Sequence, residues 1–373
     1  MCSTPSASPV CADQVAATAA CSNPVTASEN AAAVRYAPAF STVYVEEAAA
    51  GLPRTKEILS KLPKATVIPC KSYREIFNRP HQEPTRQKHA PALILAVGQP
   101  PFLYDGAPVC QDFGNRHFYY TSGVMNCIFD CEYCYLQGMY NSGHIVVFVN
   151  LEDTFAALDE ILKEHEAYVC ISYDTDLLAL EPLLGMVKAW MDFAKDRAGL
   201  TLELRTKSAS ESVLRKLPAL PNVILALTLS PEPVIAAYEH RTPPLTARLH
   251  MANTALSLGW PVRLCFDPML AVHNAADVYN AMFDTVIRTV PMAQIRDASI
   301  GVFRISGEYL RRMRRCRTSA VTCYPYELRD GVYAYPPDIA GRLLSLARER
   351  LAAVLPEDRL FFWETESSQE VTQ

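Results

Sequence analysis

Three cysteines lie close together about a third of the way along the chain. The stretch TSGVMNCIFDCEYCYLQGMY, residues 121–140, places Cys127, Cys131 and Cys134 in the spacing C-x3-C-x2-C among aromatic residues. Thiolates on one short loop can bind a metal centre, and a pair of them can carry redox chemistry. Because the loop supplies only three thiols, a centre bound by it keeps one coordination position open unless another side chain fills it.

Three kinds of chemistry fit these thiols. A structural zinc site takes four nitrogen or sulfur ligands, so Cys110 or His117 would have to supply the fourth. A thioredoxin-like redox pair would use the C-x2-C part at the start of a helix and would leave Cys127 without a role. A 4Fe–4S cluster held by three thiolates leaves one iron free for a substrate or cofactor. We expect the cluster, and a non-enzymatic zinc or iron–sulfur binding protein stays as an alternative.

The elements that must position this loop follow from an alternating pattern that begins near residue 117. The stretches expected as strands are HFYYTS, AYVCISYD, LTLELRTKS, NVILALTLS, PVRLCFDPML and ASIGVFRIS, with IVVFVN as an extra strand. Those expected as helices include LEDTFAALDEILKEH, LLGMVKAWMDFAKD, LTARLHMANTALSLG and AADVYNAMFDTVIRTV. Strands alternating with helices predict βαβ units and a parallel sheet. About six units are too few for a closed eight-stranded barrel, so we expect an α/β fold, a partial (β/α)6 TIM-like barrel with N- and C-terminal extensions.

Polar residues end nearly every expected strand. They are Cys170 and Ser172, Arg205 and Lys207, Thr228 and Ser230, Asp267, and Arg304 and Ser306. In barrels built from parallel strands, reactive residues collect at the C-terminal ends of the strands. This pattern therefore supports a functional site at that end.

The composition describes an ordinary globular chain. Half of its 373 residues are apolar, a fifth are charged, and no apolar run approaches the roughly 18 residues of a membrane span. A net charge of −5 argues against a DNA-binding role unless a local basic patch exists. The 12 cysteines form no secreted-protein ladder and no signal peptide opens the chain, so we expect a cytoplasmic location. Organellar import stays open.

The cysteine motif and its neighbours resemble those of a known family. C-x3-C-x2-C with an aromatic residue before the last cysteine, here Tyr133, is the signature of radical S-adenosylmethionine enzymes. CEYCYLQ followed by VFVNLEDTF resembles the spore photoproduct lyase family, and the similarity covers roughly residues 115–310. The resemblance implies a barrel of the radical enzyme type whose open iron binds S-adenosylmethionine and cleaves it to a 5′-deoxyadenosyl radical. That radical takes hydrogen from a methylene-bridged thymine dimer in DNA, which reverts to two thymines.

The resemblance also implies roles for individual residues. Cys170 matches the cysteine that returns a hydrogen atom to the thymine radical, and Tyr133 and Tyr135 match tyrosines that reduce the resulting thiyl. Judged from the residues alone, Cys170 is better interpreted as a small buried hydrophobe on a strand, and the donor role comes from the resemblance. The positions that match cofactor contacts are Ser172, Lys207 and Thr228, and Arg304 matches an arginine on the DNA side of the pocket.

The C-terminal part departs from the family. SAVTCYPYELRDGVYAYP is shorter and less basic than the family's hairpin, and TLS replaces a Ser-Ile-Asn. These differences concern lesion recognition rather than cofactor chemistry. The arginine-rich stretch YLRRMRRCR, residues 309–317, can neutralise phosphates or form a solvated helix face.

These observations predict five segments and one principal function. The segments are a disordered tail (1–40), an N-terminal α/β extension (41–115), the barrel (116–310), a segment facing substrate and DNA (311–365) and a second tail (366–373). We expect a carbon–carbon lyase that repairs methylene-bridged thymine dimers, with damaged DNA and an electron donor such as flavodoxin or ferredoxin as partners and no membrane. A radical enzyme of the same build acting on another nucleic acid or a small molecule is the first alternative.

Overall fold

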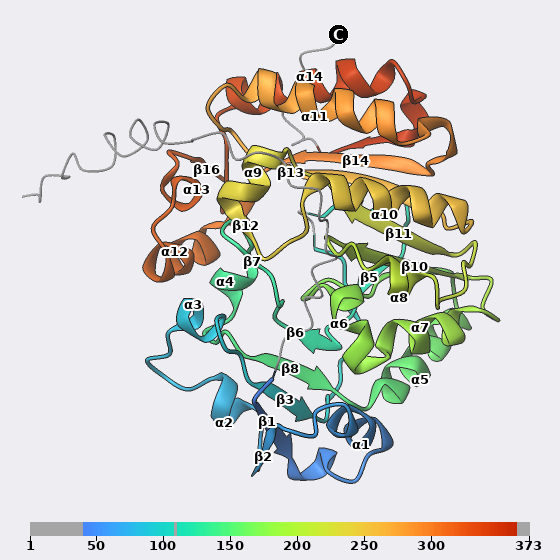
Figure 1. The fold of residues 1–373 in the computed structure, drawn as a ribbon, viewed down its shortest axis with the longest axis vertical. Coiled ribbons are helices and arrows are strands. Elements are labelled where there is room, and N and C mark those ends of the chain that lie inside the picture. The colour runs from blue at the N-terminus through green and yellow to red at the C-terminus, as the bar shows by residue number, and fades with distance from the viewer. Residues whose placement is uncertain (1–39, 108–109, 364–373) are drawn as a thin grey trace, which may run out of the picture.

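Six parallel strands form the centre of the fold, and they are the six stretches that the sequence predicts (Figure 1). The computed structural model describes residues 40–107 and 110–363, so the predicted tails lie outside it except for residue 40. The strands are β5 (Phe118–Tyr120), β9 (Ala167–Cys170), β10 (Leu200–Thr206), β11 (Val223–Thr228), β13 (Val262–Met269) and β14 (Asp297–Val302). They neighbour one another in chain order with parallel register. The predicted partial barrel is confirmed.

Helices cover the outer face of this curled sheet. They are α5 (Leu151–Leu162), α6 (Leu177–Leu184), α7 (Met186–Ala194), α8 (Glu211–Leu214), α9 (Glu232–Tyr238), α10 (Leu245–Ser257) and α11 (Ala275–Thr289). The single helix expected from LLGMVKAWMDFAKD begins only at Met186, because Gly185 takes a left-handed φ of 63° that ends α6. Glycine adopts this conformation without the steric cost that a side chain would bring. No helix in the described ranges has both the length and the apolar character needed to cross a bilayer.

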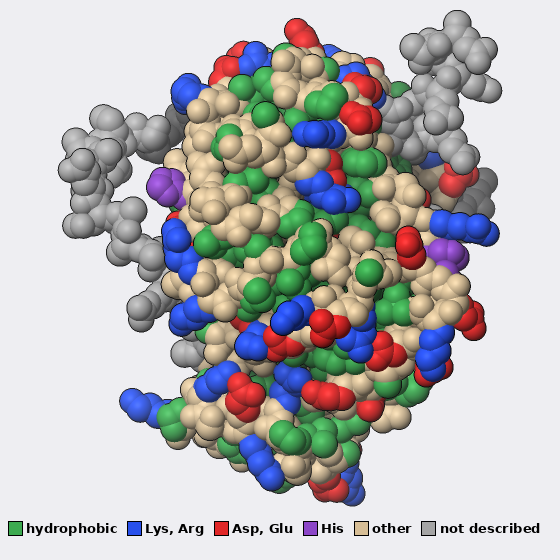
Figure 2. Space-filling model, turned by 90° about the vertical axis from the view of Figure 1, so that its right-hand side faces the viewer, with side chains coloured by type: hydrophobic (Ala, Val, Ile, Leu, Met, Phe, Trp, Pro, Cys, Tyr) green, Lys and Arg blue, Asp and Glu red, His purple; other side chains and the backbone are tan. Residues whose placement is uncertain are grey.

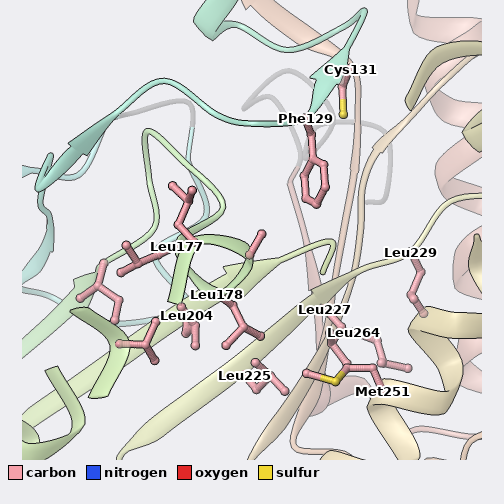
Figure 3. Packing of buried hydrophobic residues seen from close by; sticks show 14 of the residues in the cluster. Phe129, Cys131, Leu177, Leu178, Leu204, Leu225, Leu227, Leu229, Met251 and Leu264 are labelled. Atoms are coloured by element: carbon pink, nitrogen blue, oxygen red, sulfur yellow. The ribbon is translucent and has the colours of Figure 1, made fainter. Parts of the chain in front are cut away.

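Leucine side chains fill the layer between sheet and helices. On β10 and β11 they alternate with residues that face the barrel interior, as the two-residue repeat of a strand requires. Figure 3 shows Leu204 of β10 beside Leu177 and Leu178 of α6, with Leu225 and Leu227 of β11 further along the same layer. All five are essentially excluded from solvent. Burying such side chains stabilises the fold by roughly 1.5–3 kcal/mol each.

A second sheet carries the N-terminal part of the chain. It contains β1 (Thr42–Glu46), β2 (Thr66–Cys70) and β3 (Leu93–Ala96), with helices α1 (Pro53–Ser60), α2 (Arg74–Phe77) and α3 (Pro84–Gln87). The extra strand predicted at IVVFVN is β8 (Ile145–Phe148), which pairs with β3, and β6 (Val124–Met125) pairs with β8. The cysteine loop therefore leaves the barrel at β5 and returns through this second sheet.

The C-terminal part folds into a small sheet and then returns to the barrel. Its elements are β15 (Arg304–Ser306), α12 (Gly307–Cys316), α13 (Ala320–Cys323), β16 (Glu327–Arg329), β17 (Val332–Ala334), α14 (Pro337–Ala352) and β18 (Leu360–Phe362). The stretch that looked shorter than the family's hairpin does form one, because β16 and β17 pair around Asp330 and Gly331, which both have positive φ. β18 then pairs with β14 at the far edge of the barrel.

The open side of the barrel is bridged by the segment before β5. β4 (Tyr104–Asp105) pairs with β5, and the chain then runs across to β18, where the Gln111 side chain donates to the Phe362 carbonyl at 3.2 Å. The Phe113 ring lies 5.3 Å from that of Phe361 and 6.0 Å from that of Tyr168. Both edges of the sheet are thus tied together.

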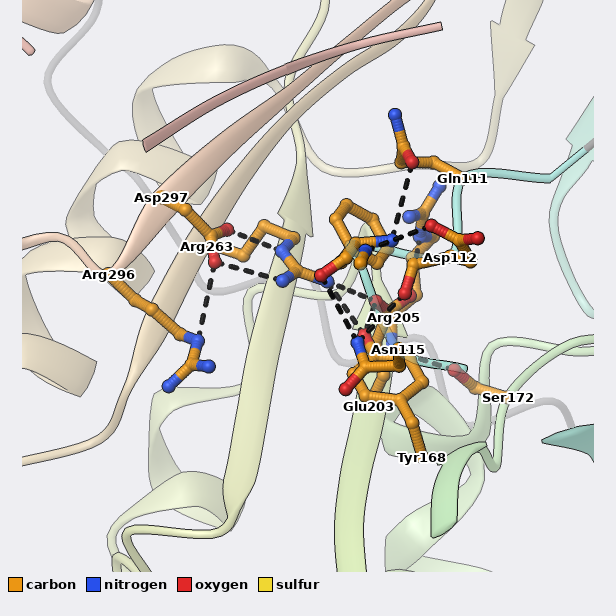
Figure 4. Close-up of polar contacts among 12 residues, drawn as sticks. Gln111, Asp112, Asn115, Tyr168, Ser172, Glu203, Arg205, Arg263, Arg296 and Asp297 are labelled. Atoms are coloured by element: carbon orange, nitrogen blue, oxygen red, sulfur yellow. Dashed lines mark hydrogen bonds and ion pairs between the residues drawn. The ribbon is translucent and has the colours of Figure 1, made fainter. Parts of the chain in front are cut away.

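A buried charge network forms one layer of the barrel interior (Figure 4). The Arg263 guanidinium, 1% exposed, pairs with Asp297 at 2.9 Å and with Glu203 at 2.7 Å, and also donates to the Tyr168 hydroxyl. Its flat face lies 3.3 Å from the Phe113 ring centroid. Burial alone would raise the pKa of Glu203, but Arg205 and Arg263 hold it below its usual range.

Removing this guanidinium should destabilise the protein strongly. Arg263→Ala removes the fully buried cation that lies between Glu203 and Asp297, and breaking a buried pair typically costs about 3–5 kcal/mol. Arg205 stays beside Glu203 at 3.0 Å and Arg296 stays beside Asp297 at 3.3 Å, which places the expected loss at the lower end of this range. Denaturant unfolding followed by circular dichroism measures the loss. The matched control is Arg342→Ala, whose ion pair with Asp338 is exposed and should contribute about 1 kcal/mol or less. Equal losses in the two variants would contradict a structural role for the network.

Candidate active site

The cysteine loop is shaped by contacts on both sides of it. Asn126 adopts a left-handed φ of 76°, and its side-chain amide donates to the Ser142 and His144 carbonyls, which starts the loop. β7 (Asp130–Cys131) then pairs with β12 (Glu239–His240), so the Cys131 backbone lies against Glu239. The Cys134 amide donates to the Cys131 carbonyl at 3.1 Å, and α4 (Leu136–Met139) follows.

A buried lysine fastens the loop to the N-terminal region. The Lys88 ammonium donates to the carbonyls of Cys127 and Phe129, the latter at 3.2 Å. Hydrogen bonds from a charged donor contribute about 1.5–3 kcal/mol each. Arg241 in turn donates to the Lys88 carbonyl. Lys88 therefore links a segment far away in the sequence to the start of the C-x3-C-x2-C motif.

The three thiols are unpaired and lie in an apolar setting with cations close by. Cys131 is buried, and Cys127 and Cys134 are half-buried. Burial raises the pKa of all three thiols, that of Cys127 to about 11. Lys88 opposes this shift at Cys127, and Lys207 opposes it at Cys131. Two lysines beside three thiols suit a centre that binds thiolates and carries negative charge.

The side chains considered as a fourth zinc ligand are engaged elsewhere. The Cys110 sulfur lies 3.4 Å from the Tyr173 hydroxyl, and the His117 ring stacks on His165 at 3.7 Å. Within residues 40–107 and 110–363, no three His, Cys, Asp or Glu side chains are grouped so as to hold one metal ion, and this includes the loop cysteines. Thiolates of a cluster bind different iron atoms and are spaced more widely than the ligands of a single ion.

Tyr133 points from the loop into a buried polar network. Its hydroxyl donates to the Glu239 carboxylate, which also accepts from Ser230 at 2.7 Å and pairs with Arg248. Burial would raise the pKa of Glu239, but Arg248 and Lys207 lower it to about 2. The Lys207 ammonium lies 5.4 Å from the Tyr133 ring centroid. The carboxylate thus holds the tyrosine in one orientation beneath the loop.

Tyr135 points in a different direction. Its hydroxyl donates to the Tyr173 carbonyl at 2.6 Å and lies 3.4 Å from Asp174. The Asp174 carboxylate also accepts from Ser122 and Tyr140. Burial raises the pKa of Tyr135 well above its usual range, so its hydroxyl keeps its proton. The two tyrosines flanking Cys134 are therefore held by separate networks.

Cys170 ends β9 and is 6% exposed. Its backbone pairs with Tyr120 on one side and Glu203 on the other. Burial, followed by the charge of Glu203, raises the pKa of the Cys170 thiol, while Arg205 opposes the rise. The sulfur therefore stays protonated, which is the form that can give up a hydrogen atom.

The predicted cofactor contacts lie at the ends of three adjacent strands. The Ser172 hydroxyl oxygen accepts from the Arg205 amide at 2.7 Å, and the Lys207 amide donates to Asp176 at 2.7 Å. Thr228 is buried at the end of β11, where its carbonyl accepts from Arg248 at 3.1 Å. The structure thus brings Ser172, Lys207 and Thr228 to one end of the barrel.

Arg304, the predicted DNA contact, begins β15 and is already engaged within the protein. Its guanidinium lies 2.9 Å from one Asp267 oxygen and 3.3 Å from the other. The Trp363 ring stacks over it at 4.1 Å. Asp267 holds the Arg304 guanidinium in one orientation. Contact between Arg304 and DNA stays a prediction.

Sequence reasoning missed several residues that position this site. They are Lys88, Asp174, Asp176, Glu239 and Arg248. Asp176 is an example: it caps α6 at Ala179 and accepts from Thr206 at 2.7 Å, so it fastens the end of β10 to the loop after β9. An aspartate directly before a helical stretch is the one signal that could have identified it.

A surface hollow on the described part of the chain lies away from this chemistry. It measures about 750 Å³ and is formed by α11 and α14, with Asn280, Asp338 and Arg342 among its walls. None of the residues that form or position the candidate site lines it. Its volume alone therefore does not identify it as the site.

A six-stranded partial barrel with a C-x3-C-x2-C loop after its first strand defines the radical S-adenosylmethionine class of enzymes. A family model described as spore photoproduct lyase matches residues 38–315 of this chain. The chain belongs to the spore photoproduct lyase family. The match begins well before residue 115, so it includes the N-terminal sheet that the sequence resemblance did not reach.

Individual relatives agree with this assignment. A curated spore photoproduct lyase from Clostridium acetobutylicum is 23% identical over 177 residues, which is 46% of this chain and 52% of that protein. The aligned part thus spans about half the length of that relative. A spore photoproduct lyase cysteine-to-alanine variant with dinucleoside spore photoproduct has a TM-score of 0.74 at 19% identity, covering 87% of this chain and 98% of that one. A double variant with bound AdoMet and the same dinucleoside has a TM-score of 0.72 at 19% identity, covering 87% and 99%.

Proposed function

We propose that this chain is a radical enzyme that reverts the spore photoproduct, a methylene-bridged thymine dimer in DNA, to two thymines. The observation that carries the proposal is the buried thiol of Cys170, whose pKa burial raises and which ends a barrel strand next to the strand that leads into the cysteine loop. Solved relatives with dinucleoside spore photoproduct bound support the same substrate class.

Two cofactors follow from the donor set. Cys127, Cys131 and Cys134 would hold a 4Fe–4S cluster, with Lys88 and Lys207 offsetting its negative charge. S-adenosylmethionine would lie against Ser172, Lys207 and Thr228 at the strand ends. Together these cofactors supply the radical that removes a hydrogen atom from an unreactive C–H bond, while the protein supplies position and exclusion of water.

The residues of the chain then control the fate of the substrate radical. Cys170 donates its S–H hydrogen to the thymine radical that remains after the methylene bridge breaks. The S–H bond is weak enough to quench a carbon radical quickly. The thiyl sulfur would then take one hydrogen atom from a tyrosine, Tyr135 or Tyr133, and the resulting tyrosyl radical would regain a hydrogen atom from the 5′-deoxyadenosine formed earlier. Both tyrosines keep their hydroxyl protons because burial raises their pKa values well above the usual range. Arg304, oriented by Asp267, contacts the DNA backbone.

Turnover of a defined lesion tests the proposal. Anaerobically reconstituted protein is given S-adenosylmethionine, dithionite and dinucleoside spore photoproduct, and the products are separated by chromatography. We expect the thymine dinucleotide to appear, together with 5′-deoxyadenosine. Boiled protein and omission of S-adenosylmethionine are the controls.

Two other outcomes separate the alternatives. Formation of 5′-deoxyadenosine without repair would identify a radical enzyme with another substrate. Absence of both products from a protein that carries iron and sulfide would identify a binding protein without this chemistry. Either outcome would overturn the proposed reaction.

A further inference from the structure

The helix α12 presents an exposed cationic face. Arg311 and Arg315, one helical turn apart, are exposed and make no side-chain ion pair or hydrogen bond with the described residues. Arg312 lies beside them and pairs with Glu308. The opposite face of α12 is buried through Leu310 and Met313. We call Arg311, Arg312 and Arg315 the arginine face.

This helix packs directly on the cysteine loop. A Cβ atom added to Gly138 of α4 would lie 2.5 Å from the Tyr309 carbonyl oxygen of α12, so only glycine permits this approach. α4 begins two residues after Cys134. Cys316, at the end of α12, shares a small cavity with Asp130 and Leu136. α12 therefore packs against α4, the segment that directly follows the loop cysteines.

Acidic residues of the loop are neutralised where the helix ends. Arg317 pairs with Asp130 at 2.6 Å and lies 3.8 Å from Glu132, which also pairs with His240 at 2.8 Å. The loop thus presents little negative charge to a partner that approaches over α12. The side of the molecule opposite α12 carries mixed charge, with Lys and Arg side chains interspersed among Asp and Glu (Figure 2).

We propose that the arginine face of α12 is the docking site of an acidic protein that carries single electrons, such as a flavodoxin. This inference rests on the proposed function, because only a cluster in the loop requires such a donor. Electron transfer slows steeply with distance, so the donor must dock near the loop. It must also avoid the strand ends, which the substrate covers while the electron is needed. The arginine face satisfies both conditions, and positive charge favours an acidic partner.

The proposed reaction between the two proteins is the transfer of a single electron. The carrier protein is oxidised by one electron, the centre held by the cysteine loop is reduced by one electron, and no atom moves between the proteins. Duplex DNA is the competing occupant of a cationic helix face. The position of α12 on the loop, rather than its charge, favours the protein partner.

Charge reversal tests the proposal by direct binding. The double variant Arg311→Glu/Arg315→Glu is compared with Lys56→Glu/Lys64→Glu, which makes the same charge change at exposed lysines of the α1 region. The dissociation constant for a purified acidic flavodoxin is measured by calorimetry at low and high salt. We expect the α12 variant alone to bind about tenfold or more weakly at low salt, with the difference shrinking at high salt.

Two further measurements distinguish a loss of flavodoxin docking from a loss of catalysis or of DNA binding. Turnover of dinucleoside spore photoproduct with dithionite, which needs no docking, should be equal in both variants, as should affinity for a duplex oligonucleotide. An unchanged flavodoxin affinity in the α12 variant would overturn the proposal, and a selective loss of DNA affinity would assign the face to DNA instead. If the unmutated protein failed to repair the dinucleoside with dithionite, the proposed function would be refuted. The flavodoxin affinity is measured separately and does not depend on that result.

Discussion

Replacing Cys131 with alanine should reduce the iron and sulfide of the anaerobically reconstituted protein to background. Cys131 is the most buried of the three loop thiols, and its backbone, not its side chain, pairs with Glu239. Without its thiolate, only two protein ligands remain for a cluster that needs at least three here. Cleavage of S-adenosylmethionine should disappear with the cluster.

The matched control for this variant is Cys265→Ala. Cys265 is fully buried on β13 and lies outside the loop. Both substitutions remove one buried sulfur and should cost a similar free energy of unfolding, about 0.5–3 kcal/mol. Iron and sulfide analysis with the absorption spectrum then separates loss of a ligand from loss of packing. A Cys131→Ala protein that retains the iron content of the control would disprove the assignment of the loop.

The second large effect is expected at Cys170. Cys170→Ala should still cleave S-adenosylmethionine when the lesion is bound, because the thiol acts only after hydrogen has been taken from the substrate. The yield of restored thymines should fall by about tenfold or more, equivalent to about 1.4 kcal/mol or more in the balance between quenching and side reactions. Chromatography with mass detection measures both the restored dinucleotide and the side products.

Here too Cys265→Ala is the comparison. Its thiol is buried, with a pKa that burial raises to about 12, so it is a second protonated sulfur in the barrel sheet. Product distribution should stay unchanged in this variant if Cys170 alone donates. Loss of cofactor cleavage in Cys170→Ala would give this residue a different role, for example in shaping the cofactor pocket.

The fold class was within reach of the sequence because its signals are local. Each barrel strand is an apolar stretch of the length that a buried strand needs, and the helices between them repeat at regular spacing. The C-x3-C-x2-C spacing lies within eight residues, from Cys127 to Cys134, so no folding is needed to see that these thiols share a loop. The place of Cys170 at the end of a strand was visible for the same reason, whereas its proposed role as hydrogen donor came from the resemblance to the spore photoproduct lyase family.

Other features depend on contacts between distant segments. No pattern in residues 84–90 indicates that Lys88 binds the loop carbonyls 39 and 41 positions later. The pairing of β7 with β12, which brings Glu239 to Tyr133, joins strands of two residues each, too short to leave a periodic signal. The break at Gly185 depends on a backbone angle that composition does not report.

The sequence by itself thus determined the barrel class, the cysteine loop and the thiol at the end of β9, since each is written in adjacent residues. Only the tertiary structure decided which charges surround these groups, that β6 and β8 leave the barrel for the second sheet, and that α12 lies against the loop. The reason is physical: spacing along the chain fixes local geometry, whereas burial and pairing between remote segments are fixed by packing of the whole molecule.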